Sequence, residues 1–284
     1  MSSEARDLDL SMPPGSARRT VQRWRGGRRS VVDDAVAEEV PVALVFNGAP
    51  FAVMMATPAD LPDFVRGFAL SEGIVRSVAE VEVEAVRTLM EGIEVRARIP
   101  DAAAEALALR RRNLSGRSGC GVCGTEMLEA ALRHPAPVAD GPRVRPAALR
   151  RALAALRAGQ SLAAATGATH AAAWAAHDGA LHLLREDVGR HNALDKLVGA
   201  MAGAGSDPRA GFCVVTSRAS YEMAMKAASA GIGLLAAISA PTALAIALAD
   251  RCNLTLVGFA REDGHAIYTH PGRLAPDAEE DPRA

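Results

Sequence analysis

The sequence of 284 residues is poor in aromatic side chains, which make up 4% of it, although hydrophobic residues make up 49%. Its core must therefore be built from alanine, valine and leucine, which indicates helices packed closely against a sheet. The formal net charge is −1, so the chain is not a globally basic nucleic-acid-binding protein and we expect no nucleic-acid partner. No apolar run reaches the ~20 residues that span a bilayer, and no signal-peptide pattern is present. These absences predict a soluble, cytoplasmic protein with no membrane partner.

Cysteine is scarce as well, with four residues in the chain. Cys120 and Cys123 lie close together, while Cys213 and Cys252 stand alone in apolar surroundings. This distribution excludes a disulfide framework and favours a reducing compartment. The Walker A and G-x-G-x-x-G motifs are also missing, so no standard phosphate-binding motif indicates a nucleotide.

The first half of the chain predicts a small α+β unit. "VPVALVFNGAPFAVMM" contains two apolar runs around Asn47-Gly48, a dipeptide typical of tight hairpins. Thr57 and Pro58 resemble a helix start and Gly73 a helix stop. A second hairpin turning at Gly92 and a helix over "DAAAEALALRRR" follow. The expected organisation is a disordered basic tail (1–30), an N-terminal α+β domain (31–112), a flexible CxxC loop (113–124), an α/β domain (125–274) and a C-terminal tail (275–284).

The second half alternates strands with helices, which predicts a largely parallel sheet covered on both faces. Helices are expected over 125–134, 146–158, 189–203, 219–229 and 241–251. Strands are expected over 169–176, 180–185, 211–216, 234–239, 254–260 and 265–270. The fold class is therefore α/β, with a three-layer αβα C-terminal domain.

Two glycine-flanked thiols form the stretch "GCGVCG" after an arginine-rich segment. A C-x-x-C pair near arginines and a helix start has a lowered thiol pKa and is reactive. Four functions remain open: a structural zinc site, a thioredoxin-like oxidoreductase, a pair of inert thiols, and a carrier thiol whose reversible cargo is a persulfide sulfur. The other two cysteines do not supply a second zinc-binding pair, so the carrier is favoured and we assign no metal.

Polar residues gather where three expected strands end. The first group is "REDVGRHN", which contains His191; the second contains Ser217 and Arg218; the third contains Ser239. The carboxyl ends of parallel strands meet at one edge, where helix N-termini offer N–H groups to anions. The pattern predicts an anion or nucleotide pocket, although each group could instead serve only to cap a helix.

In this order, "EEVPVALVFNG", "GFALSEGI", "GCGVCG", "THAAAW", "LREDVGRHNALDKLVG", "TSRASYEM", "SAPTALAIALA" and "CNLTLVGFARE" resemble the formate dehydrogenase accessory sulfurtransferases, the FdhD family. The resemblance implies that Cys120 bears a persulfide received from a cysteine desulfurase, with Cys123 as its helper. The sulfur would pass to the molybdenum cofactor, bis-molybdopterin guanine dinucleotide, before that cofactor enters formate dehydrogenase. Guanine nucleotides would bind as analogues, and the protein would be a homodimer.

The same resemblance places a cofactor-binding segment on "FAREDG", namely Phe259, Ala260, Arg261, Glu262, Asp263 and Gly264. It also implies a cytidine-deaminase-like C-terminal fold. "GRHNAL" lacks the glutamate of the deaminase H-x-E signature, so deaminase activity is not expected. The alternative function is a zinc-stabilised scaffold or chaperone for a metalloenzyme that transfers no sulfur.

Overall fold

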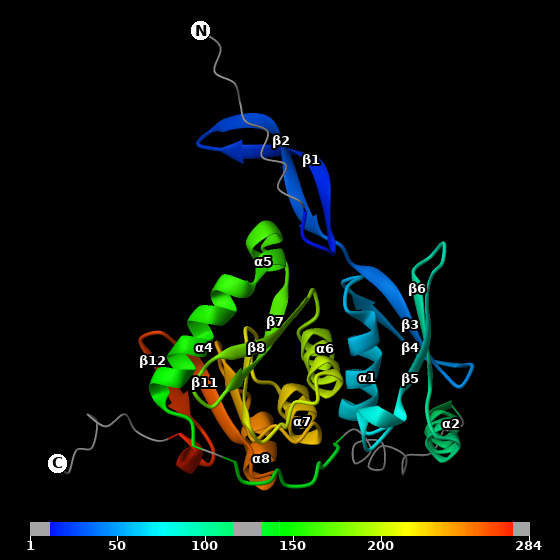
Figure 1. The fold of residues 1–284 in the computed structure, drawn as a ribbon. Coiled ribbons are helices and arrows are strands. Elements are labelled where there is room, and N and C mark those ends of the chain that lie inside the picture. Colours follow the sequence, from blue (N-terminus) through cyan, green and yellow to red (C-terminus); the bar gives the residue numbers. More distant parts are fainter. Residues whose placement is uncertain (1–11, 116–131, 142, 275–284) are drawn as a thin grey trace, which may run out of the picture.

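The computed structural model describes residues 12–115, 132–141 and 143–274, which build three sheets (Figure 1). The largest sheet has six strands and forms the centre of the C-terminal domain. In spatial order they are β12 (Gly264–Ile267), β11 (Thr255–Arg261), β10 (Leu234–Ala237), β9 (Gly211–Val215), β7 (His170–Ala176) and β8 (Leu181–Asp187).

This sheet is mixed, so the expectation of a largely parallel sheet is wrong. Only β9, β10 and β11 are parallel neighbours. The strand β7 runs antiparallel to both β8 and β9, and β12 runs antiparallel to β11. Because two reversals cancel, β8 still points in the same direction as β9, β10 and β11. Four strands therefore end at one edge of the sheet.

Helices cover both faces of the six-stranded sheet. On one face lies α4 (Pro146–Gly159); on the other lie α6 (Arg190–Gly203), α7 (Tyr221–Ser229) and α8 (Ala243–Arg251). Along β7, Ala171 and Ala173 pack into the core beneath α4, whereas Ala172 and Trp174 pack into the core beneath α6 to α8. This alternation is the two-residue period of a strand buried on both faces. The expected three-layer αβα domain is confirmed.

The N-terminal unit has a four-stranded sheet in the order β4, β3, β6, β5. Asn47 and Gly48 have left-handed φ angles of 48° and 79°, so they form the tight turn that the sequence predicts. The unit comprises β3 (Val40–Phe46), β4 (Ala49–Ala56), α1 (Leu61–Ser71), a short 3₁₀ helix η1 (Val78–Glu80), β5 (Glu82–Thr88), β6 (Ile93–Arg98) and α2 (Asp101–Ser115). Its apolar core lies between the sheet and α1.

The helix α1 starts three residues later than expected. Asp60, with a φ of 55°, occupies the N-cap position, and Leu61 is the first helical residue. Thr57 is therefore not a helix cap. It is fully buried and bonds to the C-terminal domain instead.

The helices α1 and α6 join the two domains and lie side by side in Figure 1. A Cβ atom on Gly67 would stand 1.7 Å from the backbone oxygen of Asp195, and one on Gly199 would stand 1.9 Å from the backbone oxygen of Asp63. No side chain fits in either gap, so the close approach of these backbones requires glycine at both positions.

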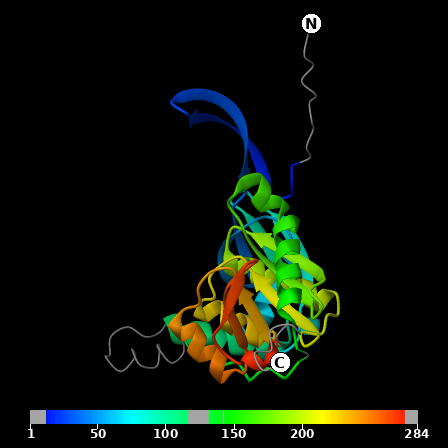
Figure 2. The same ribbon diagram turned by 90° about the vertical axis from the view of Figure 1, so that its left-hand side faces the viewer.

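The expectation of a disordered tail over residues 1–30 is wrong for residues 16–30. These residues belong to an antiparallel ribbon of β1 (Ser16–Arg25) and β2 (Arg28–Ala37). Gly26 and Gly27 both have positive φ angles and form its two-residue turn. The ribbon stands clear of the body in Figures 1 and 2.

Two further short helices were not predicted: α5 (Ser161–Thr166) and the 3₁₀ helix η2 (Pro271–Arg273). The other expected helices and strands of the C-terminal domain form within a few residues of their predicted bounds. The helix expected over 125–134 falls almost wholly outside the described residues, as do the CxxC thiols and the tail 275–284. No helix in the described part of the chain is long and apolar enough to cross a membrane.

Candidate functional site

The loops that follow β9, β10 and β11 lie next to one another at the carboxyl edge of the sheet. Ile238 donates its backbone N–H to Val215 at 3.0 Å, and Phe259 donates to Ser239 at 3.2 Å. Thr242 donates to Ala219, also at 3.0 Å. The backbone thus brings the predicted residues Ser217, Arg218, Ser239 and Phe259 together. We call this region the strand-edge site.

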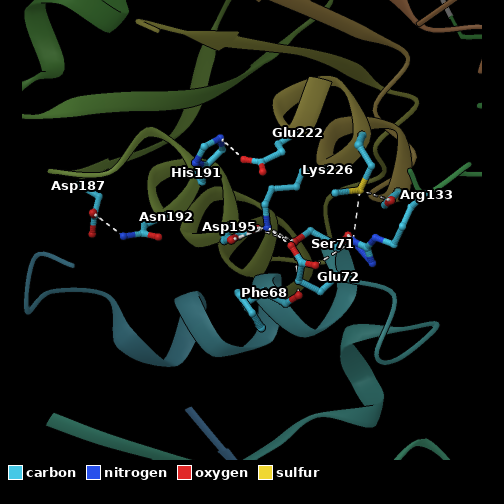
Figure 3. Close-up of polar contacts among 12 residues, drawn as sticks. Phe68, Ser71, Glu72, Arg133, Asp187, His191, Asn192, Asp195, Glu222 and Lys226 are labelled. Atoms are coloured by element: carbon cyan, nitrogen blue, oxygen red, sulfur yellow. Dashed lines mark hydrogen bonds and ion pairs between the residues drawn. The ribbon is translucent and has the colours of Figure 1, made fainter. Parts of the chain in front are cut away.

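Three helices begin at the strand-edge site, because α6, α7 and α8 follow β8, β9 and β10 directly. Their first backbone N–H groups have no partners within the helix and favour an anion. His191, in the first turn of α6, places its Nε2 atom 2.7 Å from Oε2 of Glu222 in the first turn of α7 (Figure 3). Burial lowers the pKa of His191 despite the opposing effect of Glu222. A neutral imidazole is therefore favoured next to this carboxylate.

Further polar groups lie at the same edge: Arg190 belongs to the predicted group "REDVGRHN", whereas Ser220 and His170 were not predicted as site residues. Nε of Arg190 and Oγ of Ser220 are buried and have no hydrogen-bond partner among the described residues. Buried polar atoms normally have partners, so these two atoms fit a site that binds a polar ligand. His170 lies at the start of β7, and burial together with the charge of Arg190 lowers its pKa. Ser220 could have been found from its position at the start of the helix expected over 219–229.

The segment Phe259–Gly264 divides between two surroundings. Phe259 has a left-handed φ of 51°, lies beside Ser239 and is 44% exposed. A non-glycine residue in this conformation is strained and marks a site under a structural or functional constraint. Beyond it, Ala260 is buried, and Arg261 pairs with Gly264 across the turn between β11 and β12.

Within that turn Glu262, 2.8 Å from Arg157 of α4, leans toward the sheet face opposite to α6, α7 and α8. Asp263 is exposed at the same turn. The structure therefore places Phe259 at the strand-edge site but directs Glu262 away from the helix N-termini.

Most polar residues at the end of β8 have structural roles. Asp187 accepts hydrogen bonds from the backbone of Thr57 and Gly189 and from the amide of Asn192. It also forms an ion pair with Lys196 at 2.6 Å, and both side chains are fully buried. Lys196 donates to the backbone oxygen of Thr57 at 2.9 Å. This cluster fastens the end of β4 to the C-terminal domain.

The two other charged residues of this strand end are also fully occupied. Arg185 forms an ion pair with Asp63 of α1 at 2.7 Å. Glu186 accepts the backbone N–H groups of Leu162 and Ala163, in the first turn of α5. For these residues the capping and packing interpretation is the one that the structure supports.

A second buried ionic cluster lies between α1, α6 and α7 (Figure 3). Nζ of Lys226 is 2.9 Å from Asp195 and 2.7 Å from Glu72, and it also donates to Ser71. Burial alone would lower the pKa of Lys226, but the two carboxylates outweigh it and raise that pKa. Burial disfavours the charged form of Glu72, yet Lys226 and Arg133 lower its pKa overall. Lys226 is thus held as a cation between the domains.

Arg133 connects this cluster to the chain that follows residue 131. Its guanidinium donates to the backbone oxygen of Ser71 and lies 3.0 Å from Glu72, while its own carbonyl accepts the hydroxyl of Tyr221. These contacts hold Arg133, near the start of the described chain that follows the CxxC segment, against α1 and α7.

Cys120 and Cys123 lie outside the described residues, so their predicted roles stay predictions. Cys213 is fully buried and Cys252 is 2% exposed. Burial raises the pKa of both thiols, which makes them poor nucleophiles. In the described part of the chain, no three His, Cys, Asp or Glu side chains come together as a metal site.

The layered fold of this chain is shared with a solved structure. A crystal structure of a protein from Desulfotalea psychrophila, described as a formate dehydrogenase accessory protein, matches with a TM-score of 0.72 and 26% sequence identity. The match covers 92% of this chain and 100% of that one.

Sequence comparisons agree with the structural match. Residues 37–275 match the model of the FdhD/NarQ family. A protein of Xanthomonas campestris pv. campestris strain B100 named sulfur carrier protein FdhD is 61% identical over 261 residues, covering 92% of this chain and 93% of its own. A protein of the same name from Cupriavidus necator is 52% identical over 94% of this chain and 92% of its own. The chain therefore belongs to the FdhD/NarQ family, which confirms the resemblance found in the sequence.

Proposed function

We propose that the protein is a sulfur carrier that serves formate dehydrogenase. The relatives named sulfur carrier protein FdhD, at up to 61% identity over most of the chain, are the observation that carries this proposal. The reactive pair in "GCGVCG" supplies the chemistry that such a role needs. Cys213 and Cys252 are too deeply buried to compete for the sulfur. The protein acts in the cytoplasm as a homodimer.

In the loading step, the Cys120 thiolate attacks the outer sulfur of a persulfide on a cysteine desulfurase. A new S–S bond forms on Cys120, the S–S bond of the donor breaks, and the donor thiolate leaves. This is a thiol–disulfide exchange, so no external oxidant or reductant is consumed. The sulfur then passes to its substrate, the molybdenum cofactor. Cys123 either assists loading or displaces the sulfur as sulfide by forming a disulfide, which a dithiol reductant must then open.

Mass spectrometry tests the covalent carrier directly. Incubation with a desulfurase and cysteine should add about 32 Da, the nominal mass of one sulfur, to the intact protein. We expect Cys120→Ala to abolish the adduct and Cys123→Ala to retain it. Undiminished label in Cys120→Ala would refute the assignment of Cys120. Stoichiometric zinc bound by the two thiols would instead favour the scaffold alternative.

The strand-edge site is proposed to hold the guanine nucleotide portion of bis-molybdopterin guanine dinucleotide. The support is chemical: Arg190 and Ser220 present buried polar atoms that have no hydrogen-bond partner in the part of the chain that the structure describes. Arg218 is exposed beside them, at the edge where three helices begin. Phosphates are the anions that such helix N-termini favour.

Calorimetry with GDP tests this assignment. We expect Arg218→Ala and Ser220→Ala to weaken GDP binding, and added salt to weaken it in the unaltered protein. Arg157→Ala is the matched control, since Arg157 belongs to α4 on the other face and should leave GDP affinity unchanged. Arg261→Ala tests the segment Phe259–Gly264, and we expect it to weaken GDP binding as well. If the protein loads sulfur but binds no GDP, the nucleotide assignment is wrong and the sulfur-carrier proposal is unaffected.

A further inference from the structure

The ribbon formed by β1 and β2 packs little against the rest of the described chain. Its base contacts α5, and Gly15 lies close to Thr57 and Leu162, but most of β1 and half of β2 are exposed. The ribbon projects from the body in Figure 2. Ten-residue strands extend over about 33 Å. A lone two-stranded ribbon is only marginally stable in water, so a partner surface that covers it would stabilise it.

The outer half of the ribbon carries positive charge and no acidic residue. Residues 10–32 contain six arginines and no acidic residue. The two acids of β2 are already engaged nearer the base, where Asp33 accepts a hydrogen bond from Thr20 and Asp34 pairs with Arg23 at 3.0 Å. Among the described residues, no other carboxylate pairs with an arginine of the outer half.

The tip of the ribbon therefore carries unpaired positive charge. In the described part of the chain, no carboxylate lies within ion-pair distance of Arg25, Arg28 or Arg29. Arg29 contacts only the neutral amide oxygen of Gln22, at 3.3 Å. Like charges this close repel one another, and an acidic partner would relieve that repulsion.

One face of the tip adds an aromatic anchor to this charge. The register places Trp24 opposite Arg29 and Gln22 opposite Val31, so these four side chains share a face. Trp24 is 70% exposed and Val31 is 67% exposed. Tryptophan and arginine are the residues most enriched in the energetic centres of protein interfaces.

We propose that the outer half of this ribbon docks onto an acidic surface of formate dehydrogenase. The inference rests on the proposed function, in which the protein serves formate dehydrogenase. The structural neighbour is described as an accessory protein of that enzyme, which is why the dehydrogenase is the partner chosen. Pairing of two ribbons from two copies of this chain is disfavoured, since it would bring arginine clusters together. Trp24 and Val31 fill an apolar depression, while Arg25, Arg28 and Arg29 meet carboxylates around it.

The test measures binding to cofactor-free formate dehydrogenase from the same organism by biolayer interferometry at low and physiological salt. We expect Trp24→Ala, and separately the triple variant Arg25→Gln, Arg28→Gln, Arg29→Gln, to weaken binding at least tenfold. The charge variant should also lose most of the salt dependence. A matched triple variant on the body, Arg143→Gln, Arg145→Gln, Arg251→Gln, should bind as the unaltered protein does.

Each outcome decides the proposal. Unchanged dehydrogenase affinity in both ribbon variants overturns it. A loss of self-association in the ribbon variants, measured by light scattering, also overturns it, because the ribbon would then form a contact between copies of this chain. A ribbon that binds single-stranded RNA more tightly than the dehydrogenase also overturns it. Persulfide loading of the ribbon variants should remain normal. Failure to dock would therefore be distinguished from failure of the sulfur carrier itself.

Discussion

Replacing Gly199 by alanine should strongly destabilise the contact between the domains. The new Cβ would lie 1.9 Å from the backbone oxygen of Asp63, whereas ordinary contacts begin at 3.4 Å. The clash is with backbone, so no side-chain rotation can relieve it, and α1 and α6 must separate by about 1.5 Å. Overpacking in a core costs about 1–3 kcal/mol, and we expect the upper end or more here because the crossing carries the main interface.

The same helix supplies a matched control. Gly203 is also in α6, but nothing lies within 4 Å of the position its Cβ would take. Gly203→Ala should be neutral or should stabilise the protein by up to about 1 kcal/mol, because alanine favours helix more than glycine. The comparison therefore separates steric clash from helix propensity.

Urea unfolding provides the assay. Trp174 is 3% exposed and reports on the core of the C-terminal domain by fluorescence. A Trp24→Phe background removes the signal of the exposed tryptophan. The midpoints and slopes give the free energy of unfolding of each variant. If Gly199→Ala and Gly203→Ala differ by less than about 1 kcal/mol, the close approach of the two helices is wrong.

Three other outcomes are expected. Lys196→Met leaves Asp187 as a buried unpaired carboxylate and should cost about 3–5 kcal/mol by urea unfolding, against less than about 1 kcal/mol for Arg157→Met at an exposed pair; equal losses would contradict this. The folded-state pKa of His191 is lowered from 6.5, so its stabilising contribution is present above pH 6.5 and is lost as the pH falls through the folded-state value. His191→Gln should flatten the dependence of the urea midpoint on pH between 7.5 and 5.5, and an unaltered slope would rule this out. A variant without the CxxC thiols should react with maleimide only after unfolding, because Cys213 and Cys252 are both buried; rapid labelling of the folded variant would show that one of these thiols is accessible.

Local signals in the sequence predict much of this fold. Asn47-Gly48 marks a hairpin because both residues adopt the left-handed backbone that the turn requires. The strands and helices of the C-terminal domain were found because apolar runs of distinct length alternate there. Strand order was not predictable in this way, since no local pattern states that β7 is inserted antiparallel between β8 and β9.

The ribbon of β1 and β2 was missed for a different reason. Its strands are exposed on both faces, so they lack the alternation that marks a half-buried strand. The turn itself, Gly26-Gly27, was visible in the sequence but lay within a composition typical of disorder.

The candidate site was predicted in part. Ser217, Arg218, Ser239 and Phe259 do meet, because the ends of codirectional strands must share an edge. Asp187 was misleading: its partner Thr57 is 130 positions away in the chain, so its structural role could not be read from neighbouring residues.

Four codirectional strands deliver their loops to one edge, while the layers on either side of the sheet are filled by alanine, valine and leucine. Within such a scaffold the exposed loop residues can change without disturbing the core side chains of the strands and helices. Ligand preference can therefore diverge among homologues faster than stability does. Exchange of the loop after β9 or β10 between family members is accordingly a practical way to transplant specificity onto an unchanged framework.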